Sequence, residues 1–420
     1  FSKLQLPDGT NYLAEKNTFN FAGGVKFGTP APNAPSDMIL ADLHGEYGMF
    51  GLNFKQMAAT ATHNPSFVFR KSYFCFGDKI VCTGSDISNN DGTNKTITTL
   101  FQTSLPSAGS PTVVDGASKT GITQSEDLSK ANAHWLIDAY KTGYYVLAGN
   151  TIHVERQSQT SPDQSGSGAT TTANFANAYI DHGNAPAGGK YAYVIAPNTT
   201  TGEMTGFASD MQSPSTRAFD ILQQDADAHI IRENATGVTG FSLFMPNNNL
   251  VSNDILKGND VPCVAVMQIK EDTLRISLVN PDLKLVNNVS TAVPITLTLY
   301  GKWSKIPGIP SGYASVLSSE GMETIIQFTP ADGLPAEIGL IKSNEVILPV
   351  TSLSFSGRSD APGNQNVLHL KIENDNEMMT YYLERQASGS STWKVIDNYS
   401  FEATTGSQEY SFYDKNMEAP

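Results

Sequence analysis

The sequence predicts an all-β protein, and three observations carry this prediction. Short runs rich in β-branched and aromatic residues recur along the whole chain, and many of them alternate between apolar and polar positions. Turn-forming residues are frequent, with Gly 35 and Pro 22 in 420 residues. Helical periodicity is confined to two short segments, 204–212 and 215–224. This pattern favours an all-β protein of the sandwich class.

The predicted strands are four to eight residues long and have Gly, Asn, Asp or Pro nearby. Representative strands are expected at 66–70, 79–83, 143–147, 190–195, 263–266 and 273–278. Around the turn Gly77-Asp78, a two-residue hairpin would pair Cys75 with Ile80 and Tyr73 with Cys82. The polar segment 159–175 is expected to be a surface loop.

Two boundaries divide the expected strands into three domains. The first lies near Asp225, where a new strand series begins, and the second lies at 343–349. The domains are therefore expected at 1–225, 226–344 and 345–420. The last one carries strands at 367–372, 380–385 and 393–396, and it is expected to be one or two strands short of a closed sandwich. The chain starts at Phe1 without a signal-peptide pattern, so we expect it to be part of a longer precursor.

Composition excludes several classes of protein. A net charge of −14 and a pI near 4.9 argue against nucleic-acid binding, which needs a basic surface. No run approaches the length of a membrane-spanning helix. The three cysteines, Cys75, Cys82 and Cys263, are too few for a disulfide scaffold and are predicted to be free buried thiols.

The motifs of common cofactor and metal sites are missing. There is no HExxH or paired CxxC for zinc, no phosphate-binding loop and no nucleophile elbow. No motif requires a cofactor, and a structural calcium ion in the loop from Asp86 to Asp91 has no motif to support it. Asp181 and His182 stand where a strand enters a turn, and a turn hydrogen bond is their expected role.

One segment stands out for its spacing. His44 and Gly45 precede Glu46 and Tyr47, and Gly48 follows them. Flanking glycines permit a sharp bend and close backbone approach, which would hold the Glu46 carboxylate in a fixed position. The alternative interpretation is an ordinary tight turn with an exposed glutamate, and composition alone favours that alternative.

Around these residues the chain resembles polysaccharide lyase family 8, the chondroitin sulfate ABC and hyaluronate lyases. The first similar segment is residues 42–50 (DLHGEYGMF). Others follow in the family's order at 71–81 (KSYFCFGDKIV), 98–102 (TTLFQ), 135–138 (WLID), 178–183 (AYIDHG), 227–231 (DAHII), 272–277 (DTLRIS) and 280–283 (NPDL). The tail, with YLER at 382–385 and YSFYD at 410–414, is similar to a fibronectin-III-like module of secreted bacterial proteins.

The resemblance implies a β-elimination that cleaves hexosaminide–uronate bonds. A base removes the C5 proton, an acid protonates the leaving oxygen, and the uronate carboxylate must be neutralised. In the family a helical (α/α) toroid is followed by a large β supersandwich and a smaller β-sandwich, and the resemblance implies that these two are residues 1–225 and 226–344. The toroid of the family supplies His, Tyr and Arg, and the β part supplies one Glu, which corresponds to Glu46. His44 and Tyr47 are the candidate substrate-binding residues. The toroid would precede Phe1, so this chain alone is expected to be inactive, and the toroid would supply the basic surface that an acidic polysaccharide needs.

Two function classes remain open at this stage. The chain is either the C-terminal part of a secreted, extracellular or periplasmic bacterial glycosaminoglycan lyase, or a carbohydrate-binding or scaffold module without catalytic duty. Glu46 would line an interface cleft in the first case and an exposed turn in the second. The sequence does not determine which uronate polymer is the substrate, whether action is endo or exo, or the oligomeric state.

Overall fold

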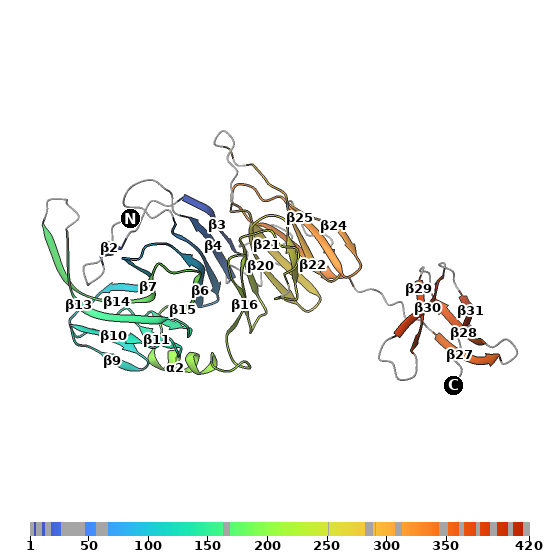
Figure 1. Cartoon of the computed structure of the whole chain (residues 1–420), viewed down its shortest axis with the longest axis horizontal. Helices are drawn as coiled ribbons and strands as arrows, with labels where there is room; N and C mark the ends of the chain where they lie inside the picture. Colours follow the sequence, from blue (N-terminus) through green and yellow to red (C-terminus); the bar gives the residue numbers. More distant parts are fainter. Residues whose placement is uncertain are drawn as a thin grey trace, which may run out of the picture. The chain divides into compact units, whose positions relative to one another are not determined.

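The computed structural model describes most of the chain between Tyr47 and Asp414. The described residues are 4–5, 11–12, 18–26, 47–55, 66–162, 169–250, 252–281, 289, 291–306, 313–343, 352–360, 365–374, 379–386, 393–401 and 406–414. They fold almost entirely into antiparallel strands, which confirms the predicted all-β class (Figure 1). No helix of the described residues is long and apolar enough to cross a membrane.

The chain divides into two compact units, Phe1–Lys342 and Ser343–Pro420. The expected domain boundaries at 225/226 and 344/345 stay predictions. In the described part, unit 1 contains four main sheets and a short pair of strands, β1(Leu4–Gln5) and β2(Asn11–Tyr12).

The central sheet has nine strands, and both of its faces are covered. In spatial order they are β3(Thr18–Lys26), β4(Tyr47–Lys55), β5(Val68–Phe76), β6(Lys79–Ser88), β15(Gly189–Ala196), β12(Gly143–Val146), β11(His134–Ile137), β8(Thr112–Val114) and β9(Ala117–Lys119). Alternate residues of one strand point to opposite faces. In β5, Phe74 and Phe76 therefore join one core, while Phe69 and Tyr73 pack against another.

The outer sheet covers the second of these faces. Its strands are β10(Gln124–Leu128), β13(Thr151–Pro162), β14(Thr170–Asn184) and β7(Lys95–Ser104), in that order. The core between the outer and central sheets includes Leu136, Ile152 and Ile180, all fully buried or nearly so. The expected loop at 159–175 was wrong for its described residues, because β13 and β14 form a continuous ladder from Thr151↔Asp181 to Pro162↔Thr170. Cross-strand Thr and Ser pairs make such a polar ladder compatible with a hairpin.

The other face of the central sheet packs against the adjoining sheet, which leads into a second sandwich. The adjoining sheet consists of β16(Phe219–Gln224), β17(Ala228–Glu233), β18(Thr239–Leu243), β20(Cys263–Lys270), β21(Thr273–Val279), β26(Ala336–Lys342) and β23(Trp303–Lys305). An end sheet closes the second sandwich with β19(Leu256–Asn259), β22(Ile295–Tyr300), β25(Glu323–Phe328) and β24(Ala314–Glu320). The hydrophobic core of this sandwich includes Phe241, Leu297 and Phe328.

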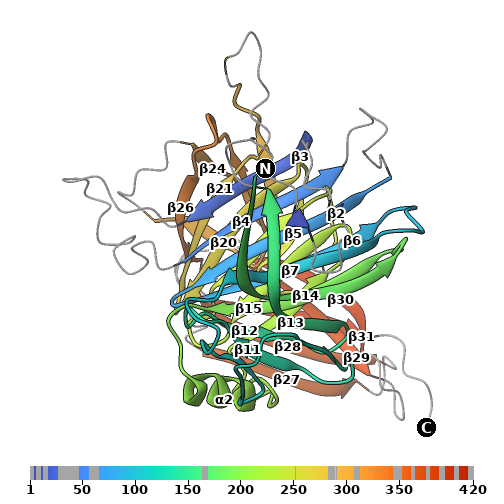
Figure 2. The ribbon, with the colours of Figure 1, turned by 90° about the vertical axis from the view of Figure 1, so that its left-hand side faces the viewer.

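One helix, α2(Thr201–Asp210), lies beside β11 and β12 (Figure 2). It begins with a capping box, in which Thr200 and Glu203 bond to each other's backbone N–H groups. Met204 is buried against Gly143, where an added Cβ would lie 2.6 Å from the Met204 sulfur. The helix predicted at 204–212 therefore exists. The one predicted at 215–224 was wrong, because Phe219–Gln224 instead pairs with β17, and tertiary pairing overrides weak local preference.

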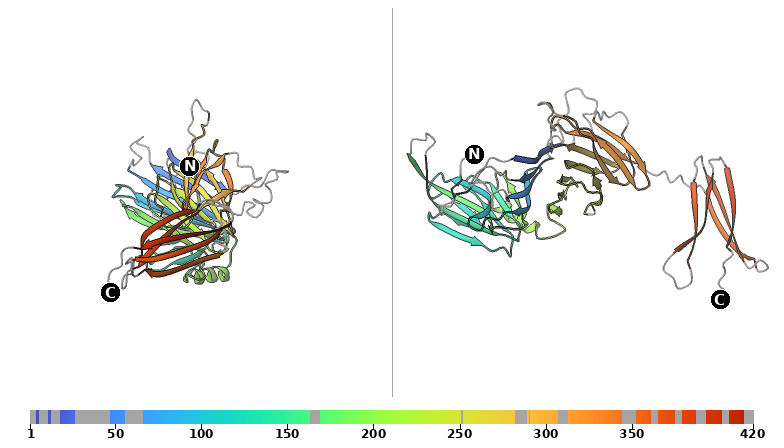
Figure 3. Two further views of the ribbon diagram at one scale, coloured as in Figure 1. Left: turned by 90° about the vertical axis from the view of Figure 1, so that its right-hand side faces the viewer. Right: turned by 45° about the horizontal axis from the view of Figure 1, so that its top comes forward.

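Unit 2 is a small β module. Its strands are β27(Ser352–Asp360), β28(Gln365–Asn374) and β31(Gly406–Asp414) in one sheet, with β29(Met379–Gln386) and β30(Trp393–Phe401) in another (Figure 3). Leu383 of β29 packs against Leu370 and Phe412 of the other sheet. The strands predicted at 367–372, 380–385 and 393–396 are confirmed.

Candidate functional site

The segment with His44 and Glu46 leads directly into β4, and both residues lie outside the described residues. Tyr47, the first described residue of this segment, is 8% exposed and packs in the core between the central and adjoining sheets. It pairs with Phe76, the last residue of β5. Tyr47 is therefore an apolar anchor for the start of β4, and substrate contact by its hydroxyl stays a prediction.

The register shows which groups share the edge of the central sheet at which β4 begins. Phe76 pairs with Lys79 across the β5–β6 turn, and Ile80 pairs with Ile195 near the end of β15. The predicted pairing of Cys75 with Ile80 and of Tyr73 with Cys82 is confirmed, and all three cysteines are free. The β5–β6 turn and the end of β15 therefore lie at the same edge as Tyr47.

A pocket of about 350 Å³ opens at this edge, between the β5–β6 turn and the start of α2. Its charged lining residues are Asp78, Lys79, Glu203 and Asp210. The Lys79 ammonium lies 2.8 Å from an oxygen of Asp78, and it also lies 5.6 Å from the centre of the Phe207 ring. Three carboxylates against one paired ammonium make this edge acidic.

Hydrogen bonds keep the helix-side carboxylate of this pocket ionised. The Glu203 carboxylate accepts from the Thr200 hydroxyl at 2.9 Å and from the Thr200 backbone N–H at 2.8 Å. These bonds lower the pKa of Glu203 below its ordinary value. Negative charge at the N-terminus of α2 also complements the helix dipole.

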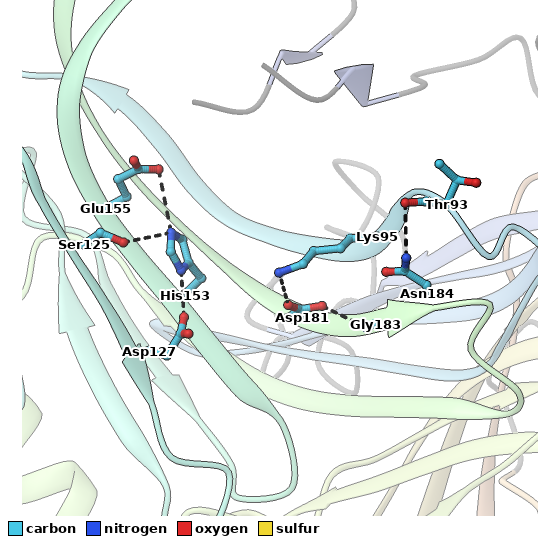
Figure 4. A network of polar contacts seen from close by, with 9 residues as sticks. All are labelled: Thr93, Lys95, Ser125, Asp127, His153, Glu155, Asp181, Gly183 and Asn184. Atoms are coloured by element: carbon cyan, nitrogen blue, oxygen red, sulfur yellow. Dashed lines mark hydrogen bonds and ion pairs between the residues drawn. The ribbon is translucent and has the colours of Figure 1, made fainter. Parts of the chain in front are cut away.

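Asp181 and His182 have structural partners on the far side of unit 1. Figure 4 shows Asp181 receiving the Lys95 ammonium at 2.8 Å and the Gly183 N–H at 2.8 Å. The expected turn hydrogen bond is therefore confirmed. The His182 Nε2 atom lies 2.9 Å from the Thr98 hydroxyl, and burial lowers the pKa of His182 to about 4, so its ring is neutral at neutral pH.

The same outer face carries a second polar cluster (Figure 4). The His153 ring lies 2.7 Å from Asp127, 3.7 Å from Glu155 and 3.4 Å from the Ser125 hydroxyl. These contacts link β10 to β13 across the ladder. His153 is therefore a polar link between the two strands.

The structure gives no support to a structural calcium ion in the loop from Asp86 to Asp91. The Asp86 carboxylate pairs with Arg70, and Asp91 accepts the backbone N–H groups of Thr93 and Asn94. Within the described ranges, no cluster of three or more His, Cys, Asp or Glu residues is arranged to hold a metal ion.

Lys79 and the α2 carboxylates were not singled out from the sequence. Lys79 follows a turn, where an exposed lysine is commonplace, and Glu203 fits a routine capping box. The signal that identifies Lys79 is the hairpin register, which carries it to the same edge as Tyr47 once β4 is known to pair with β5.

Comparison with known proteins shows what this architecture is similar to. Residues 41–208 match the model of the polysaccharide lyase family 8 super-sandwich domain. The chain is 27% identical over 301 residues to the chondroitin sulfate ABC endolyase of Proteus vulgaris, covering 71% of this chain and 29% of that protein. It is 29% identical over 352 residues to the chondroitin sulfate ABC exolyase of Bacteroides thetaiotaomicron, covering 77% and 30%.

Solved structures show the same fold. The Paenibacillus xanthan lyase superposes with a TM-score of 0.57 at 18% identity, over 89% of this chain and 41% of that chain. The Streptomyces coelicolor chondroitin AC lyase superposes with a TM-score of 0.54 at 16% identity, over 71% and 35%. This chain thus spans less than a third of the length of the two curated relatives above.

Proposed function

The chain carries the super-sandwich domain of polysaccharide lyase family 8, and from this premise we propose that it is the β part of a secreted bacterial glycosaminoglycan lyase. The substrate class is a polymer of hexosamine and uronic acid, such as chondroitin or dermatan sulfate or hyaluronan. Relatives named as chondroitin sulfate, hyaluronate and xanthan lyases support the class. The bond to the uronic acid is broken by β-elimination.

The chemistry requires groups of both charges around one sugar. The proton on C5 becomes acidic only when positive or hydrogen-bonding groups neutralise the neighbouring carboxylate as the enolate forms. A base then takes that proton, and an acid protonates the departing O4 oxygen. The described lining of the pocket beside Tyr47 contains no Arg, His or Tyr, and its carboxylates would repel a polyanion. The base, the acid and the basic groove therefore come from a helical toroid domain.

Glu46 is the residue that the β part contributes. Its carboxylate accepts hydrogen bonds from the Arg and Tyr of the toroid, which stiffens both and holds the Arg in place. The observation that carries this proposal is the anchoring of β4, because the buried Tyr47 ring fixes where the strand begins. A side chain that positions catalytic groups needs such a rigid support.

The proposal is tested first by activity of the chain itself. Incubated with chondroitin sulfate, this 420-residue chain should release no unsaturated disaccharide, measured by absorbance of the new C4–C5 double bond. The same chain joined to the toroid domain should release it readily. Turnover by the chain alone would contradict the proposal that the toroid supplies the base and the acid.

The second test is substitution of Glu46 in the protein that includes the toroid. Glu46→Gln should lower kcat about 100-fold or more with little change in the unfolding midpoint, because a displaced Arg and Tyr lose their alignment. The matched control is Glu126→Gln, since Glu126 of β10 forms a partly exposed pair with Lys119 of β9 and should leave kcat unchanged. Near-normal kcat in Glu46→Gln would remove the catalytic role and favour a non-catalytic binding module.

A further inference from the structure

A second pocket lies at the opposite end of the central sheet from Tyr47. It has a volume of about 200 Å³ and is lined by Phe67, Phe69, Lys71, Ile87, Thr96, Ile97, Thr98, Thr99, His182 and Tyr191. Phe67 and Phe69 stand at the start of β5, whereas Tyr47 pairs with the residue that ends this strand. At about 3.3 Å per residue, the nine residues of β5 separate the two edges by roughly 25 Å.

One wall of this pocket is aromatic and well supported. Phe54, Phe67 and Phe69 form a cluster with ring centres 4.4 to 5.7 Å apart. Tyr191 of β15 lies on the same face of the central sheet, over Gly84, its cross-strand partner. An added Cβ at Gly84 would lie 2.3 Å from the Tyr191 ring, so the glycine is needed for this ring position.

The same face carries the Lys71 ammonium, which forms no ion pair with a carboxylate of the described residues. Among the described residues, Lys79, Lys95, Lys119, Lys257 and Lys371 all form ion pairs with Asp or Glu. Lys71 does not, although the chain has 41 acidic and only 27 basic residues. Its ammonium instead lies 5.1 Å from the Tyr73 ring centre and 6.0 Å from that of Tyr191.

Lys71 carries its charge beside a neutral Tyr191. Burial acts to lower the pKa of Lys71, but the oxygens of Tyr191 and Tyr73 outweigh it and raise the pKa overall. Burial raises the pKa of Tyr191 to about 12. The positive charge in this pocket is therefore not cancelled by a phenolate at neutral pH.

We propose that this pocket binds one acidic sugar ring, with a carboxylate or sulfate on Lys71 and the ring between the aromatic face of the central sheet and the outer-sheet residues Thr98 and His182. The apolar face of a pyranose suits Phe67, Phe69 and Tyr191, while Thr98 and His182 offer polar groups to its hydroxyls. A volume of about 200 Å³ fits a single ring and not a polymer segment. The site is separate from the edge where the proposed lyase chemistry occurs, so it would act in holding a chain end or a product.

The test is direct binding of D-glucuronate, N-acetylgalactosamine 6-sulfate, inorganic sulfate and D-glucose to this chain, by saturation-transfer NMR and calorimetry at low salt. For a ligand of this size, a dissociation constant on the order of 1 mM is expected for the acidic sugars. Lys71→Met should weaken binding about 10- to 100-fold, since it removes a charge-assisted hydrogen bond. Lys71→Arg should retain most of the affinity, and Lys95→Met is the matched control, because Lys95 pairs with Asp181 outside the pocket.

Each outcome decides the proposal. Acidic-sugar binding that falls in Lys71→Met, recovers in Lys71→Arg and is unchanged in Lys95→Met supports it. No binding by either acidic sugar, or equal binding by wild type and a folded Lys71→Met, overturns it. Sulfate binding as tightly as the sulfated sugar overturns the role of the ring, and D-glucose binding as tightly as glucuronate overturns the role of the charge. These binding measurements do not depend on lyase activity, so a negative lyase assay does not change their interpretation.

Discussion

His229 makes the stability of unit 1 depend on pH. It belongs to β17 of the adjoining sheet, is 0% exposed, and inserts among hydroxyl groups of the central sheet. Its Nδ1 lies 2.8 Å from the Ser72 oxygen and 3.2 Å from the Thr83 oxygen, and its Nε2 lies 2.8 Å from the Ser85 oxygen. Ser85 donates its own proton to the Asp225 carbonyl, so it accepts from Nε2 and the ring fits as a neutral tautomer.

The magnitude follows from the pKa difference between folded and unfolded chains. Burial lowers the pKa of His229 to about 3, from an ordinary value of 6.5. The folded state therefore binds its proton less readily than the unfolded state. The contribution of His229 to the free energy of unfolding is complete above the pKa that this residue has in the unfolded chain, and it is lost as the pH falls below that pKa. At 1.36 kcal/mol per pH unit, the loss reaches about 2 kcal/mol at pH 5 and continues to grow as the pH falls toward 3.

The assay is urea unfolding at pH 8 and pH 5 for wild type, His229→Gln and His153→Gln. Wild type and His153→Gln should lose about 2 kcal/mol more between these pH values than His229→Gln does, with equal m-values. His182, whose pKa burial lowers to about 4, is present in all three proteins and cancels from the comparison. An equal loss in His229→Gln and wild type would refute the assignment.

Two further predictions concern single side chains that hold sheets and loops in place. Arg156 is 1% exposed and donates to several loop carbonyls, including that of Gly121 at 3.0 Å. Arg156→Met should therefore lower the free energy of unfolding by about 3 kcal/mol. A loss below about 1 kcal/mol would contradict this role. Gly240 of β18 faces the central sheet, where an added Cβ would lie 2.5 Å from the Phe74 ring, so Gly240→Ala should cost about 1–3 kcal/mol. Its control is Gly206→Ala in α2, which has open space around it and should stabilise the protein by about 0.5–1 kcal/mol. If urea unfolding shows that both substitutions change the free energy of unfolding in the same direction, the packing argument is wrong.

The fold class and many strands were predictable because each strand carries its own signal. Residues 263–266 are apolar and include two valines, residues 273–278 alternate between apolar and polar positions, and they form β20 and β21 as expected. The predicted hairpin pairing around Gly77 held because a two-residue turn fixes the register on both sides. These are local rules, which need no knowledge of distant residues.

The errors arose where pairing with distant residues decides the structure. Residues 219–224 have no strong strand signal, yet they form β16 because β17 offers an edge to pair with. Residues 159–162 and 170–175 look like a polar loop, but they extend a ladder that starts at Thr151. Composition distinguishes such polar strands poorly from loops.

The two candidate sites also differ in whether the local sequence identifies them. Glu46 was found from a local pattern of flanking glycines and a resemblance, and its catalytic role stays a proposal. The pocket at Lys71 could not be found locally, since it combines β5, β7, β14 and β15. In the sequence, the one hint of this pocket is Gly84, because a glycine within a strand often marks the close approach of another group.

The burial of both faces of the central sheet determines where chemistry can occur in this fold. Ser72, Thr83 and His229 are all buried on the face toward the adjoining sheet, and that face offers no room to a sugar. Polar groups that must reach a ligand are therefore left to the strand ends, which is where both pockets of this sheet lie. Because the strands between them are packed on two sides, each edge is held by a rigid support. Replacing residues at one edge should accordingly alter that site while leaving the other edge, and the register of the sheet, unchanged.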